Sequence, residues 1–181
     1  MNDGLDGKLT LLSAPAGFGK TTLISHWVEN LQQNNEIDVP PIDVAWLSLD
    51  EDDNDPTRFL TYFVTALYQI KDIEGDIGKG ALNMLQSPQT PSFNNILISL
   101  INDLARTPEK IVLILDDYHL IEEKPIHQAL QFLIENQPSQ LHLVISTRQD
   151  PSLSLGRFRA QGQMTELRAA DLRFSYSEVV E

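Results

Sequence analysis

The stretch that decides the fold of this chain is residues 13–22, which read SAPAGFGKTT. Residues 8–12 before it, KLTLL, are mostly apolar and predict a strand. The residues after it predict a helix from Thr21 to about Gln33, because apolar side chains recur there at helical spacing: Leu23, Ile24, Trp27, Val28 and Leu31. Gly17 and Gly19 let the backbone between strand and helix turn tightly. We therefore expect a strand-to-helix turn whose backbone amides point toward one place.

This turn has the sequence context of a phosphate-binding loop. The loop amides and the positive end of the following helix together favour an anion. In such a loop Lys20 reaches the β- and γ-phosphates of a nucleotide, and the hydroxyl of Thr21 ligates Mg²⁺. The residues predicted to bind ATP or ADP are Ala16, Gly17, Phe18, Gly19, Lys20, Thr21 and Thr22.

One position departs from the phosphate-loop pattern G-x-x-x-x-G-K-[ST]. Ala14 occupies the place of the first glycine, which is acceptable only if that residue does not need a positive φ. The alternative interpretation is a glycine-rich turn with an unrelated lysine. The net charge of −13 does not exclude a nucleotide, because salt screens distant carboxylates over about 8 Å and the loop itself is positive.

The remainder of the chain alternates strands with helices. Apolar runs predict strands at residues 44–49, 111–115, 141–146 and 164–167. Helices are predicted after Asp55-Pro56, after Ser92 and over 125–136, whereas residues 75–91 are predicted to form an irregular connection. The run at 111–115 is typical of a strand buried on both faces of a parallel sheet. We therefore predict an α/β fold, a three-layer sandwich with a mostly parallel five-stranded sheet between helices.

Two carboxylates, Asp116 and Asp117, follow the most apolar of these strands. Beside a phosphate loop we predict that Asp116 holds Mg²⁺ through water, and that Asp117 orients or deprotonates the attacking water. The alternative is an acidic turn after a buried strand.

Arg148 ends the next strand, and ligands of parallel sheets lie at the carboxyl ends of strands. We predict that its guanidinium group contacts the γ-phosphate, because a fork of donors suits phosphate oxygens. The alternative is a surface arginine that pairs with a carboxylate such as Asp150.

Residues 50–55, which read DEDDND, form a mostly acidic cluster at another predicted strand end. Asp50 is a candidate for positioning water or metal there, but a solvated loop that caps the next helix is the favoured interpretation. His119 and His127 have no partner His or Cys at metal-ligand spacing, and we interpret both as surface or helix residues.

Composition excludes several classes of protein. With 181 residues the chain suggests one domain, and without cysteine it has no disulfide or thiolate metal site, which fits the cytoplasm. It contains no apolar stretch long enough for a membrane span and no secretory signal. Its 13 Lys+Arg against 26 Asp+Glu form no basic cluster, so we expect no nucleic acid to bind through this segment.

We expect the nucleotide-binding domain to span residues 1–174. Residues 175–178 read SYSE, which has the form of a helix-opening capping box. Residues 175–181 are therefore expected to begin a further helical module that is cut short.

Four blocks of the chain resemble, in this order, the ATPase module of MalT-like, ATP-dependent regulators of the LuxR family: SAPAGFGKTTLISHW, AWLSLDEDDNDPTRFLTYFVTAL, IVLILDDYHLI and LHLVISTRQDPSLSLGRFRAQGQMTELRAADLRFSYSEV. Such modules, which are NB-ARC- or NACHT-like, belong to the STAND class of P-loop ATPases. The resemblance covers nearly the whole chain. It implies a P-loop NTPase sheet of the ASCE type with strand order 5-1-4-3-2, which places Arg148 over the γ-phosphate.

The same resemblance implies an ATP/ADP switch that controls self-association of the full-length protein, with hydrolysis as a slow reset. Proteins of this family usually have an upstream segment that helps to hold adenine, whereas only residues 1–7 precede the first strand here. They also continue into helical, winged-helix and sensor modules and a C-terminal helix-turn-helix. The resemblance therefore implies an excised core, with DNA contacted through the absent helix-turn-helix.

These features predict a domain of a transcriptional activator that binds Mg-ATP and hydrolyses it weakly, with Lys20, Asp117 and Arg148 in the catalytic roles. One alternative is a P-loop small-molecule kinase in which Asp50 contacts the acceptor hydroxyl. Another is an interaction module whose nucleotide site is idle.

Overall fold

The five strands of this protein form one parallel sheet in the order β2-β3-β4-β1-β5. The computed structural model describes residues 4–33, 42–70, 77–89 and 91–172. The strands are β1 (Leu9–Ser13), β2 (Ile42–Ser48), β3 (Lys110–Asp116), β4 (Leu141–Thr147) and β5 (Met164–Arg168). Read from the other edge, this is the order 5-1-4-3-2. The predicted α/β fold with a parallel sheet is therefore confirmed.

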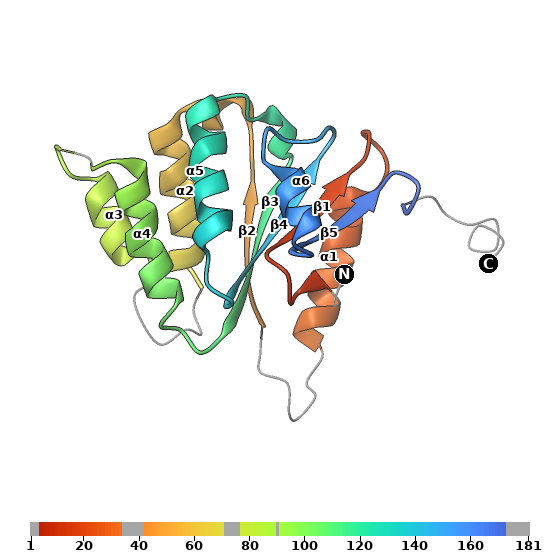
Figure 1. Ribbon diagram of the computed structural model, residues 1–181, viewed down its shortest axis with the longest axis horizontal. Coiled ribbons are helices and arrows are strands. Elements are labelled where there is room, and N and C mark those ends of the chain that lie inside the picture. The colour runs from red at the N-terminus through yellow and green to blue at the C-terminus, as the bar shows by residue number, and fades with distance from the viewer. Residues whose placement is uncertain (1–3, 34–41, 71–76, 90, 173–181) are drawn as a thin grey trace.

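The described residues also form six α-helices, which lie on both faces of the sheet (Figure 1). They are α1 (Lys20–Gln33), α2 (Pro56–Tyr68), α3 (Lys79–Leu85), α4 (Phe93–Leu104), α5 (Lys124–Asn136) and α6 (Leu155–Ala160). Figure 1 shows α1 on one side of the sheet and α2, α4 and α5 on the other. This arrangement is the predicted three-layer sandwich. None of these helices is long and apolar enough to cross a membrane, as far as the described ranges extend.

Side chains alternate along the central strands between two cores of unequal size. On β3, Leu113 and Leu115 belong to the larger core, which lies under α2, α4 and α5. Val112 and Ile114 face the other way, into the smaller core under α1. The apolar residues of β3 are therefore buried on both faces, as their near-continuous apolar sequence predicts. Because all strands are parallel, their carboxyl ends meet at one edge of the sheet.

The predicted irregular connection at 75–91 contains the short helix α3. Gly78, at φ 79°, precedes its first turn, and Ala81 and Leu85 are buried. Sequence reasoning missed this helix because only these buried positions mark its inner face, and glycines at 78 and 80 disfavour a helix. Its stability comes from packing against α4 and α2. The predicted capping box at residues 175–178 lies outside the described residues.

Candidate functional site

The loop between β1 and α1 has the backbone geometry that its glycines permit. Gly17 and Gly19 have φ of 82° and 72°, in the left-handed region that favours glycine. A Cβ built on either residue would meet no atom within 4 Å, so open space lies in front of both. Apart from Asp117, no described residue other than glycine has a positive φ. Alanine at position 14 is therefore compatible with this turn.

Lys20 begins α1 and folds back across this loop. Its Nζ donates hydrogen bonds to the carbonyl oxygens of Ala14 at 2.8 Å and of Pro15 at 3.2 Å. Burial lowers the pKa of its ammonium group, and the neighbouring Asp117 opposes that effect. The structure thus holds a cation beside the loop through two backbone carbonyl groups.

The two predicted metal-binding groups lie together although they are far apart in sequence. Oγ1 of Thr21 donates a 2.9 Å hydrogen bond to Oδ2 of Asp116, which is buried at the end of β3. Oδ1 of the same carboxylate accepts from the backbone N–H of Asp117 at 3.0 Å. No cluster of three or more His, Cys, Asp or Glu side chains suited to a metal occurs in the described parts of the chain. One hydroxyl and one carboxylate fit Mg²⁺, which usually keeps several waters and takes further oxygens from phosphate.

A pocket of about 250 Å³ joins the loop to the neighbouring strand ends, and its lining consists of Ala16, Gly17, Gly19, Lys20, Thr21, Thr22, Asp117 and Arg148. Most of the predicted nucleotide-binding residues therefore border one cavity, and all three of the predicted catalytic side chains, Lys20, Asp117 and Arg148, line it. Phe18 does not line it, and Asp116 contacts it through Thr21. A larger hollow of about 840 Å³ lies along α5, but the phosphate loop contributes nothing to its lining.

Asp117 enters the pocket from a strained backbone position. Its φ of 57° and ψ of 35° are left-handed, a conformation that Asp tolerates better than most residues. The residue precedes a short 3₁₀ turn, Tyr118–Leu120. This turn directs the buried Tyr118 away from the pocket, where its hydroxyl lies 2.7 Å from Nδ1 of His127 on α5. Asp116, the last residue of β3, and Asp117 after it therefore face the loop, while the next side chain anchors the turn.

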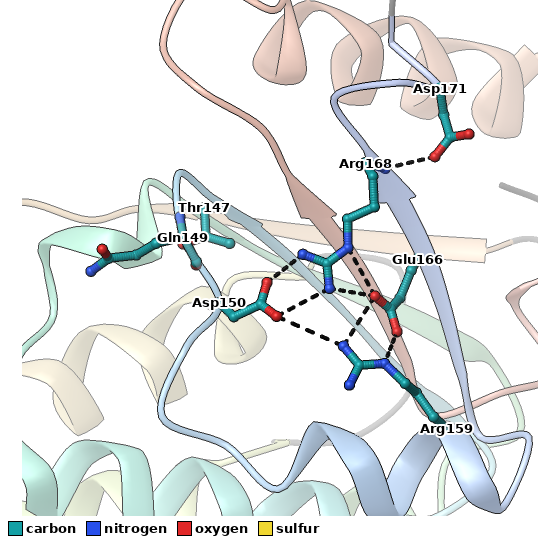
Figure 2. A network of polar contacts seen from close by, with 7 residues as sticks. All are labelled: Thr147, Gln149, Asp150, Arg159, Glu166, Arg168 and Asp171. Carbon is teal, nitrogen blue, oxygen red and sulfur yellow. Dashed lines mark hydrogen bonds and ion pairs between the residues drawn. The ribbon is translucent and has the colours of Figure 1, made fainter.

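Arg148 lines the pocket, whereas two other arginines contact the nearby carboxylate of Asp150. Figure 2 shows Asp150 between Arg168 and Arg159, with Glu166 bonded to both of these arginines. Hydrogen bonding from Arg168 lowers the pKa of Asp150. Arg148 itself has no hydrogen bond or ion pair to any described residue. The alternative that Arg148 pairs with Asp150 is therefore wrong.

The acidic residues after β2 form a structural cap. Arg58 lies within 3.6 Å of Asp50, 3.5 Å of Asp52 and 3.2 Å of Asp53. Asp50 accepts from the backbone N–H of Asp52, and Asp55 caps α2 by accepting from the N–H of Arg58. None of these carboxylates lines the phosphate-loop pocket. The favoured interpretation of a capping loop is confirmed.

Two polar residues near the pocket escaped the sequence-based prediction. His119 was predicted to lie on the surface or a helix, but it lies in the 3₁₀ turn and its side chain is only 10% exposed, with Nδ1 3.8 Å from Oδ1 of Asp117. Both its ring nitrogens, and the hydroxyl of Ser146, are buried without a hydrogen-bond partner among the described residues. Burial and the nearby Arg148 lower the pKa of His119. The only sequence signal was proximity: His119 lies two positions after Asp117, and Ser146 lies two positions before Arg148.

Comparisons with known proteins agree with this geometry. The AAA ATPase domain family matches residues 3–146. The chain is 35% identical over 171 residues to the HTH-type transcriptional regulator MalT of Cronobacter sakazakii, and 34% identical to MalT of Klebsiella pneumoniae. In each case the match covers 94% of this chain and 18% of the relative, so the chain spans about a fifth of their length.

Solved structures share the fold at low sequence identity. The Aeropyrum pernix ORC1 protein, solved in complex with DNA, has a TM-score of 0.60 and 16% identity, with 89% of this chain and 39% of that chain covered. The Aeropyrum pernix ORC2 protein, solved as ADPNP-ADP complexes, has a TM-score of 0.55 and 16% identity, with 92% and 44% covered. These chains show the same P-loop ATPase architecture. Over nearly its whole length the chain is similar to part of the MalT-type transcriptional regulators, and it belongs to the AAA ATPase domain family.

Proposed function

We propose that this module is a nucleotide-dependent switch that binds Mg-ATP and Mg-ADP and hydrolyses ATP slowly. The observation that carries the proposal is the convergence of the phosphate-loop residues with Asp117 and Arg148 on one pocket, next to the Thr21–Asp116 pair. Such convergence suits a triphosphate, because amides, an ammonium and a guanidinium group all favour phosphate oxygens.

Each side chain has a role that follows from its position. Lys20, which now contacts two carbonyl groups, would contact phosphate oxygens, and Thr21 and Asp116 would hold Mg²⁺, which would supply neutralisation of phosphate charge. Asp117 orients the attacking water, and Arg148 contacts the γ-phosphate. The catalytic residues are thus Lys20, Asp117 and Arg148, as the sequence predicts.

The switch depends on how strongly ATP and ADP differ in affinity for its two states, at about 1.4 kcal/mol for each tenfold difference. Arg148 is where we place that difference, because it has no described partner to compete with a γ-phosphate. We further propose that the module belongs to the STAND class and that the ATP form controls self-association of a longer regulator.

The setting of the module is also a proposal. We assign residues 1–174 to the nucleotide-binding domain and 175–181 to the start of a helical module, in line with the short share of the MalT relatives that the chain spans. The absence of cysteine supports a cytoplasmic location. The net charge of −13 supports DNA binding by another part of the regulator rather than by this segment.

Calorimetric titration of the purified chain with Mg-ATP and with Mg-ADP tests the proposal. Saturable binding of both nucleotides supports it, and an inability to bind either one contradicts it in favour of an idle interaction module. The kinase alternative has less support, because Asp50 is engaged by Arg58 and the N–H of Asp52. That alternative predicts phosphate on an added acceptor rather than free phosphate.

A further inference from the structure

Ser146, near the carboxyl end of β4, carries a buried hydroxyl that no described hydrogen bond explains. The residue has no exposed surface, and its Oγ has no hydrogen-bond partner among the described residues. Buried polar groups are nearly always paired, because burial removes the water that would otherwise bond to them and an unpaired group costs free energy. A neighbouring side chain that takes up this hydrogen bond only when a ligand binds accounts for such a group.

The strand register identifies which residue Ser146 faces. Val144 of β4 and Ile114 of β3 are register partners and both point into the core under α1. Side chains alternate along a strand, so Ser146 and Asp116, each two residues further, point to the same face. The register pair Leu115 and Ile145 precedes them directly. Asp116 therefore lies opposite Ser146 at the carboxyl edge, while Leu12 faces Ser146 from β1 on the other side.

The carboxylate of Asp116 retains unused acceptor sites. Its two oxygens each accept one hydrogen bond, from Thr21 and from the N–H of Asp117. A carboxylate offers about four lone-pair sites, so a third donor has room. Leu12 offers no acceptor on its side chain. Of the two residues opposite Ser146, only Asp116 has a side chain that can accept a hydrogen bond from its hydroxyl.

We propose that Ser146 is a positioning residue for the metal site, whose hydroxyl donates a hydrogen bond to Asp116 when Mg-nucleotide is bound. This rests on the proposed nucleotide site. Thr21 and the Asp117 N–H each donate one hydrogen bond to this carboxylate and so set its orientation. With the metal bound, the carboxylate would also help to hold the ion, and the hydroxyl of Ser146 would fix the orientation of the carboxylate from the neighbouring strand.

The test measures metal dependence separately from nucleotide binding. ADP is titrated by calorimetry into the full chain in EDTA and at a series of Mg²⁺ concentrations. Ser146→Ala should raise the Mg²⁺ concentration for half-maximal tightening of ADP binding by roughly tenfold, the size expected for one hydrogen bond to a charged group. ADP affinity in EDTA should stay at the wild-type value. Ser146→Thr, which keeps the hydroxyl, should restore the metal dependence.

The melting temperature distinguishes a positioning role of Ser146 from a purely structural one. Because the hydroxyl has no partner without nucleotide, Ser146→Ala should melt no lower than wild type in EDTA. The control is Thr10→Val, which removes another buried hydroxyl on the same face, 2.9 Å from Nε2 of His142. That variant should melt lower while its Mg²⁺ dependence stays unchanged.

The inference is overturned if Ser146→Ala needs the same Mg²⁺ concentration as wild type. A lower melting temperature of this variant in EDTA, with equal losses of ADP affinity with and without metal, overturns it too, because Ser146 would then support only the fold. Wild-type chain that binds no ADP under either condition would instead contradict the proposed function. Wild-type binding with an unaffected Ser146→Ala variant contradicts this inference alone.

Discussion

The hydroxyl of Thr21 donates a 2.9 Å hydrogen bond to the carboxylate of Asp116, although 95 positions separate them in the chain. Thr21 belongs to the first turn of α1 and Asp116 ends β3. Between β1 and β3 in the sheet lies β4, so the bond spans the strand that also carries Ser146 and leads to Arg148. This hydrogen bond joins the phosphate loop to the acidic end of β3.

Replacing Lys20 by alanine should weaken the binding of both ATP and ADP. The ammonium group contacts phosphates that both nucleotides carry, and hydrogen bonds to charged groups of about 1.5–3 kcal/mol imply a loss of roughly 10- to 100-fold. Calorimetry of both nucleotides with Mg²⁺ measures this. Lys110→Ala, at the opposite end of the sheet with its partner Asp6, is the matched control and should bind normally. Undiminished affinity of Lys20→Ala for both nucleotides would show that the phosphate-binding loop is assigned wrongly.

Asp117→Asn should keep Mg-ATP bound while hydrolysis slows. The amide preserves the shape of the side chain but cannot accept a proton, and losing general-base catalysis costs about 10²- to 10⁴-fold. Phosphate release by a regulator that contains this module measures the rate. Asp52→Asn, a change in an exposed carboxylate of the capping loop, should leave the rate unaltered. Wild-type turnover of Asp117→Asn would remove this residue as the water-activating group.

Arg148→Ala should weaken ATP more than ADP. Only ATP carries the γ-phosphate that we assign to this guanidinium group, and one charge-assisted hydrogen bond supports a difference of roughly tenfold. The ratio of the two dissociation constants is the measurement. Arg106→Ala is a suitable control, because Arg106 is 75% exposed and pairs locally with Asp103. Equal losses for the two nucleotides would make Arg148 a structural residue rather than a sensor.

The carboxylates of Asp150 and Glu166 (Figure 2) should make part of the free energy of unfolding depend on pH. Hydrogen bonds from Arg168 and Arg159 lower the pKa of Asp150 and of Glu166 in the folded protein. Their contribution is therefore present above the ordinary carboxyl pKa values of 3.8 and 4.5, and it is lost as pH falls through the lowered values. Asp150→Asn should reduce the melting temperature at pH 7, and this reduction should shrink progressively as pH falls below 3.8.

The control for this comparison is Asp6→Asn, because Asp6 is 95% exposed in its pair with Lys110. Surface pairs of this kind contribute little, so its melting temperature should follow wild type at pH 7 and at pH 3. An Asp150→Asn variant that loses equal stability at pH 3 and pH 7 would show that the charges of the network are not what stabilises this edge.

Much of the fold and part of the site are predictable from local sequence. The GFGKTT run specifies a tight turn into a helix, because only glycine reaches the required φ easily, and the apolar run before Asp116 specifies a strand buried on both faces. Short helices such as α3 were missed, because seven residues with glycines at 78 and 80 become helical only when packed against neighbours.

The sequence by itself determined the strand-to-helix loop, the buried apolar strand that ends in acidic residues, and the candidate side chains. These features depend on backbone conformations and apolar runs within a few residues. Only the tertiary structure decided their partners: Thr21 with Asp116, Asp150 with Arg168 instead of Arg148, and a buried place for His119. The physical reason is that strand order and register bring together groups from distant segments. Short-range spacing cannot specify which carboxylate a guanidinium group will reach.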